Sequence, residues 1–139
     1  MTTEPPPSIP PWFVTLRFVS VLVLVHALAW VPLLLFMLQM VPRYKLIFAD
    51  FGMKLPELTM EVVDWSDFIV NHPIRVGAAL AVFLVLDGAI LFLLRRYSST
   101  PLLSWLWFIL VALLPLSAWI CAWLSMWLPL EELMEDLAK

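Results

Sequence analysis

The sequence contains few of the residue types from which disulfides, metal centres and active-site loops are built. Among its 139 residues are one cysteine, three glycines and two histidines, and only 14% are charged. The single Cys121 excludes an internal disulfide and a multi-cysteine metal or redox site. Eight basic residues against eleven acidic residues leave no cationic surface for nucleic acid, so we expect no nucleic-acid partner.

Motifs for catalysis are absent as well. The sequence has no glycine-rich phosphate loop, no cluster with metal-ligand spacing, and no serine, histidine and carboxylate set outside its apolar segments. His72 precedes Pro73 and is explained as a residue at a helix end, while Cys121 in an apolar segment is expected to be inert. We therefore predict that the protein is not an enzyme and has no cofactor or metal.

Apolar residues are in large excess. They make up 63% of the chain, and the mean hydropathy is +0.97. Soluble domains are about 45–50% apolar, and a soluble domain this small could not bury so much apolar surface. The composition therefore predicts an integral membrane protein.

Charged residues divide the chain into three apolar segments. Residues 18–42 carry no charge, residues 76–94 carry only Asp87, and residues 97–130 carry none. About 20 apolar residues are enough for a helix to cross a hydrocarbon core of roughly 30 Å. We therefore predict an all-α protein with three transmembrane helices, at residues 12–41, 75–95 and 102–128.

The segments around these spans have distinct patterns. Residues 1–11 contain five prolines and predict a disordered tail. Residues 42–74 predict an amphipathic helix-turn-helix cap, in which Leu58, Val62, Trp65 and Ile69 share one face and the acidic side chains occupy another. Residues 96–101 predict a tight basic turn. Residues 129–139 predict a separate acidic amphipathic helix.

The connection between the first two spans carries a family resemblance. Residues 41–71 read VPRYKLIFADFGMKLPELTMEVVDWSDFIVN. This segment resembles the stretch after the first transmembrane helix in the type II secretion system F family, which includes the type IV pilus platform proteins. The resemblance is carried by Val-Pro, Ile-Phe, Phe-Gly, Leu-Pro-x-x-Thr and Ser-x-Phe steps, which include Pro42, Phe51, Gly52, Leu55, Pro56 and Thr59.

The resemblance implies a shared membrane hairpin with its connection outside the cytoplasm. It places the chain in the bacterial inner membrane with a cytoplasmic N-terminus, but only residues 95–100 stand where the family has a cytoplasmic domain. The paired Arg95 and Arg96 agree with this orientation under the positive-inside rule. The total count opposes it, because three basic residues would lie inside and five outside. We predict the orientation with the N-terminus inside.

Two ionisable residues lie near the middle of predicted spans, His26 in the first and Asp87 in the second. Antiparallel spans place them at similar depth, which allows a hydrogen bond or ion pair. Three interpretations follow: a proton relay or ion pathway, because histidines titrate near neutral pH; an interhelical polar contact that sets register; or a protonated Asp87. The interhelical contact is favoured, because proton pumps use chains of such groups.

Two stripes of opposite character mark the third span. Small residues at four-residue spacing allow helices to approach closely. Those of the third span are Ser117, Cys121 and Ser125, and a further pair, Gly77 and Ala81, lies in the second span; together they predict a helix-packing face, within the protomer or between protomers. A tryptophan stripe predicts a face toward lipid or a partner, made of Trp119, Trp123 and Trp127.

The leading functional hypothesis is a structural or scaffold subunit. Its partners are membrane lipid and either further copies of the chain or other membrane-complex subunits. The first alternative is a homo-oligomeric channel or proton-conducting element that uses Asp87 and His26. The second is a reduced secretion or pilus platform component.

Overall fold

The computed structural model describes residues 11–52, 54–98 and 100–138, and no strand occurs among them. The elements in chain order are α1 (Pro11–Leu35), the π-helical turn η1 (Phe36–Met40), α2 (Val41–Asp50), α3 (Glu57–Asn71), α4 (Pro73–Tyr97) and α5 (Leu102–Leu137). The predicted disordered tail lies outside the described residues apart from its last residue, Pro11, which begins α1.

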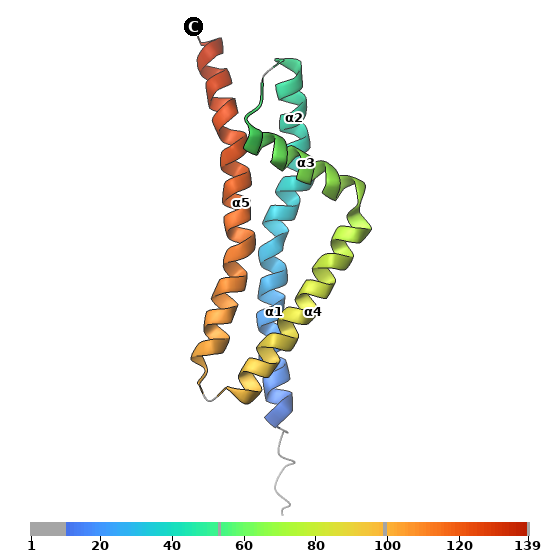
Figure 1. Cartoon of the computed structure of the whole chain (residues 1–139), viewed down its shortest axis with the longest axis vertical. Helices are drawn as coiled ribbons and strands as arrows, with labels where there is room; N and C mark the ends of the chain where they lie inside the picture. The colour runs from blue at the N-terminus through green and yellow to red at the C-terminus, as the bar shows by residue number, and fades with distance from the viewer. Residues whose placement is uncertain (1–10, 53, 99, 139) are drawn as a thin grey trace, which may run out of the picture.

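Within the described part of the chain, three helical stretches are long and apolar enough to cross a membrane: Trp12–Asp50, Pro73–Tyr97 and Leu102–Glu135. The predicted all-α class with three candidate transmembrane helices is therefore confirmed. Figure 1 shows α1, α4 and α5 close together toward the N-terminal end of the molecule. Toward the other end α4 leans away from α5, and α3 lies across the helices there.

The first span does not end where the sequence predicted. Instead of a span over residues 12–41 followed by a separate helix from Pro42, α1, η1 and α2 form one uninterrupted helical stretch. Proline breaks a helix by removing an N–H donor and by crowding the preceding turn. Here the turn before Pro42 is π-helical, with the Val41 N–H bonded to the Phe36 carbonyl, and this wider turn accommodates the ring.

The third long helix continues beyond the predicted end of its span. The separate helix predicted over residues 129–139 is wrong, because α5 runs through Pro129 to Leu137. Its 36 residues correspond to a length of about 54 Å. That length exceeds a hydrocarbon core of roughly 30 Å, so α5 is long enough to extend well beyond a bilayer.

Two hydroxyls of α3 compensate for two of the prolines in the long helical stretches, Pro42 and Pro129. Thr59 Oγ1 donates to the carbonyl of Ser125 at 2.7 Å, and Ser66 Oγ donates to the carbonyl of Met37 at 2.6 Å. The Ser125 carbonyl would otherwise accept from residue 129, which is proline and has no N–H. The Met37 carbonyl loses the Val41 N–H to the π turn, and Pro42 has none to offer. Both hydrogen bonds therefore satisfy carbonyls that their own helices leave unpaired.

These bonds determine which face of α3 points inward. Thr59 and Ser66 are two helical turns apart on one face, and both are buried, as is Val63 between them. The predicted apolar face is only partly directed toward the core. Val62 and Ile69 pack against it, but Leu58 and Trp65 are 70% and 62% exposed.

The remaining residues of the connection motif have mainly backbone roles. Gly52 follows α2 with φ of +61°, the left-handed conformation that glycine adopts without strain. Leu55 packs against the core, Pro56 immediately precedes α3, and Phe51 is exposed.

Candidate functional site: a buried polar cluster between the three long helices

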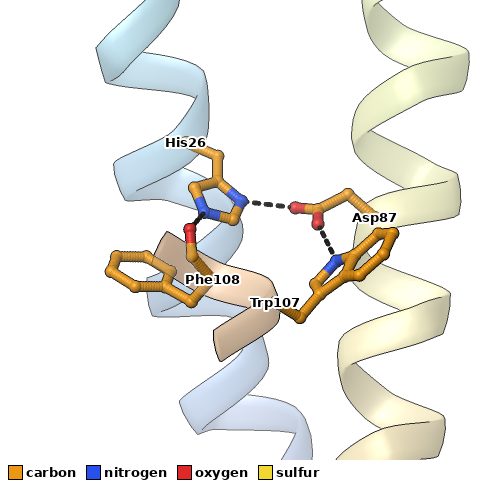
Figure 2. Close-up of polar contacts among 4 residues, drawn as sticks. All are labelled: His26, Asp87, Trp107 and Phe108. Atoms are coloured by element: carbon orange, nitrogen blue, oxygen red, sulfur yellow. Dashed lines mark hydrogen bonds and ion pairs between the residues drawn. The ribbon is translucent and has the colours of Figure 1, made fainter. Parts of the chain in front are cut away.

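The candidate site is a set of polar groups contributed by all three long helices. His26 comes from α1, Asp87 from α4, and Trp107 and Phe108 from α5 (Figure 2). His26 falls in the buried stripe of α1, between Leu22 and Leu33. Only 1% of His26 and 2% of Asp87 is exposed, so the helices seal both residues from the surroundings.

Every polar atom of the His26 and Asp87 side chains has a partner. His26 Nδ1 lies 2.6 Å from Asp87 Oδ2, and His26 Nε2 lies 3.0 Å from the Phe108 carbonyl oxygen. Trp107 Nε1 donates to Asp87 Oδ1 at 2.9 Å (Figure 2). The His26 ring also stacks on the Phe108 ring, with centroids 4.7 Å apart.

The partners determine the net charge of the pair. A carbonyl only accepts hydrogen bonds, so Nε2 of His26 carries a hydrogen and donates it to Phe108. One further proton then lies between Nδ1 and Asp87 Oδ2. The pair is either an imidazolium beside a carboxylate or a neutral imidazole beside a carboxylic acid. Its net charge is zero in both forms, which avoids the large cost of an isolated charge in an apolar interior.

The hydrogen-bonding groups of this cluster are used within the protein. Its donors and acceptors are already paired within the protein, and neither His26 nor Asp87 is accessible to a substrate. Each hydrogen bond crosses from one helix to another, so together they fix the rotation and depth of α1, α4 and α5.

The structure brings together the two residues that the sequence singled out, and it adds two partners that the sequence did not indicate. If α4 and α5 ran side by side from the turn that joins them, Asp87 would lie opposite a residue near Ala112. The observed partner, Trp107, lies more than one helical turn closer to that turn. The long indole side chain spans this offset, which the spacing of residues along the chain does not specify.

Comparison with known proteins finds no matching family model, curated protein or solved structure. Function is therefore inferred from the geometry of the chain itself.

The close approach of α1 to α4 occurs beside the cluster, at Gly88. A Cβ added there would lie 3.3 Å from Val23 Cγ2. The predicted small pair, Gly77 and Ala81, does not pack within the protomer: both are exposed, and a Cβ at Gly77 would meet no atom within 4 Å. The tight contact thus uses a glycine outside the predicted stripe.

Replacing Gly88 with leucine is expected to destabilise the protein by about 1–3 kcal/mol through overpacking against Val23. Gly77→Leu is the matched control, since it adds the same side chain to the same helix where space is open. Its effect is expected to stay within about 0.5 kcal/mol. Denaturation in mixed detergent micelles measures both, and equal effects would contradict a close approach at Gly88.

The stripes of α5 also face outward from the protomer for most of their length. Ser117 and Cys121 are exposed, while Ser125 is half-buried and its carbonyl accepts from Thr59. The buried side of α5 is instead formed by Ser104, Val111, Pro115, Ala122, Met126, Pro129 and Leu133. In the tryptophan stripe, Trp119 packs on the core, whereas Trp123 and Trp127 are exposed and stack with centroids 5.4 Å apart.

Proposed function

We propose that the protein is a non-enzymatic structural subunit of an oligomer or larger complex in the bacterial inner membrane. The sealed and fully paired polar cluster is the observation that carries this proposal. His26 and Asp87 are almost wholly buried and all their polar side-chain atoms are paired within the protein, so neither residue presents a free donor or acceptor to a substrate. The cluster is suited to holding three helices in one arrangement.

The outer faces of the helices support an assembly role. Gly77 and Ala81 on α4, and Ser117 and Cys121 on α5, are exposed on the protomer. Small residues on an exposed helix face allow a second helix to approach closely in a membrane. The exposed Trp123 and Trp127 add large apolar surface for contact with lipid or a partner.

The proposed orientation places the N-terminus in the cytoplasm and α2 and α3 as a cap on the opposite side. Arg95 and Arg96 in the last turn of α4 support it, because basic residues near span ends favour the cytoplasmic side. Descent from a secretion or pilus platform protein stays a prediction from the resemblance of residues 41–71. In this chain Pro42, Thr59 and Ser66 of that segment take part in joining α3 to the long helices.

The test is the mass of the complex extracted in mild detergent, with its components identified by mass spectrometry. We expect a mass above that of one 16.0 kDa chain, from further copies or from other proteins in fixed ratio. Ala81→Trp is expected to reduce the complex to single chains by blocking the small-residue face. Val82→Trp is the matched control, because Val82 is also exposed but lies on a different face of α4.

Two results would overturn the proposal. One is a single chain under every mild extraction condition. The other is proton flux in proteoliposomes that the wild-type chain supports and Asp87→Asn abolishes, which would establish the conducting alternative. A structural subunit is expected to show no such flux, and Asp87→Asn should then change only its stability.

A further inference from the structure

A wide apolar groove has residues of α3 along one side. Figure 1 shows that α4 leans away from α5 near α3. Its volume is about 860 Å³, which is within the roughly 300–1,000 Å³ typical of small-molecule sites. Side chains of α1, α3, α4 and α5 line it. Among its lining residues, the rings of Trp30 and Phe83 meet edge to face, with centroids 5.8 Å apart.

One end of the groove is charged and the rest of its lining is apolar, which matches the two parts of an amphiphilic molecule. Arg75 is the one charged side chain among its described lining residues, and it lies at the end beside α3. From Arg75 to Phe83 the groove follows α4 for about 12 Å. The lining there is apolar, with Val76, Ala79 and Leu80 between the two ends.

Arg75 is available for an anion. Its side chain is exposed, and no ion pair or hydrogen bond joins it to another described residue. It belongs to the first turn of α4, which begins at Pro73, and the N-terminal end of a helix favours negative charge. Trp65 and Phe68 line the groove from α3, as aromatic side chains do at the headgroup level of membranes.

We propose that this groove binds a membrane phospholipid, with its acyl chains against the apolar lining and its phosphate paired with Arg75. An apolar wall with one cation at the end nearest the membrane surface complements a molecule with one anionic group and a long hydrocarbon part. None of the residues assigned to the polar cluster or to the small-residue faces lines this groove, so the inference does not rest on the assembly role.

The experiment measures lipid binding to the full chain by native mass spectrometry from detergent micelles, with dioleoyl phosphatidylglycerol as the added lipid. Arg75→Gln is expected to weaken binding about tenfold by removing a charge-assisted hydrogen bond to phosphate. Arg96→Gln removes a charge at the other end of α4 and is expected to leave binding unchanged.

The acyl-chain part of the site is tested with two neighbouring alanines of α4. Both are exposed, but only Ala79 lines the groove. Ala79→Phe is expected to abolish the bound lipid, and Ala78→Phe to retain it. Dioleoylglycerol, which has the same chains but no phosphate, is expected to bind weakly to the wild-type chain and to be insensitive to Arg75→Gln.

Three results would overturn the proposal. The first is equal lipid binding by the Ala79→Phe and Ala78→Phe chains, both verified as folded by circular dichroism. The second is equal binding of phosphatidylglycerol by the wild-type and Arg75→Gln chains, a comparison that does not depend on core packing. The third is a groove occupied by a transmembrane helix of a copurifying protein. If the proposed complex is not found, both lipid-binding comparisons still apply.

Discussion

Replacing Asp87 with alanine is expected to lower the free energy of unfolding by about 2–4 kcal/mol. Interhelical hydrogen bonds in membranes contribute about 0.6–2 kcal/mol each, and Asp87 makes two of them. The substitution also leaves the buried N–H of Trp107 without an acceptor, which adds the desolvation cost of that group. Unfolding by sodium dodecyl sulfate in mixed micelles measures the change.

Three further variants separate the contributions within the cluster: Trp107→Phe, His26→Ala, and His26→Ala combined with Asp87→Ala. Trp107→Phe removes one hydrogen bond and keeps an aromatic ring, so its cost should be smaller than that of Asp87→Ala. His26→Ala combined with Asp87→Ala should cost less than the sum of the single changes, because the two residues share one proton. Strict additivity of those two substitutions would show that the pair does not form in the membrane.

Removing both hydroxyls of α3, with Thr59→Val and Ser66→Ala, is expected to cost about 2–4 kcal/mol. Each substitution leaves a carbonyl of a proline-containing helix without its donor, at Ser125 and at Met37. We also expect α3 to loosen from the bundle, since these bonds join it to α5 and to the η1 turn that follows α1. Unfolding in mixed micelles gives the stability, and hydrogen exchange over residues 57–71 reports the loosening.

A proline substitution tests the cause of this effect. In Pro129→Ala the new N–H at position 129 can bond to the Ser125 carbonyl, so Thr59→Val should cost much less in that background. Ser117→Ala is the control, because the Ser117 hydroxyl bonds locally to the Leu114 carbonyl on an exposed face. Its effect should stay within about 0.5 kcal/mol. An unchanged cost of Thr59→Val in the Pro129→Ala background would contradict the proposed compensation.

The existence of the three long helices was predictable because a hydrocarbon interior imposes length and composition directly on the sequence. The meeting of His26 and Asp87 was predictable for a related reason. The two residues lie at similar distances from Arg17 and Arg95, which mark the same end of antiparallel helices. Depth in a bilayer is thus partly encoded by position along the chain, whereas the rotation of each helix is not.

The helix ends were mispredicted at prolines, and the reason lies far away in the sequence. The carbonyl left free by Pro129 is satisfied by a hydroxyl 66 residues earlier, and the one at Met37 by a hydroxyl 29 residues later. Helix propensity predicts that proline ends a helix, because a propensity describes the residue alone and contains no information on donors far away in the sequence. The close contact with α1 is likewise made by Gly88 and not by Gly77, because of the way the helices cross. The spacing of small residues along the sequence does not determine that crossing.

The polar cluster also has a consequence for the order in which the helices settle into a bilayer. Synthesis proceeds from the N-terminus, so His26 is made 61 residues before its acidic partner, and Trp107 follows Asp87 by 20 residues. When α4 enters the membrane, His26 is already available to pair with Asp87 Oδ2. Asp87 Oδ1 has no partner until Trp107 of α5 follows. All polar side-chain atoms of His26 and Asp87 are therefore paired only when all three long helices are present. A truncated chain that lacks α5 should be a preferred substrate for membrane quality control.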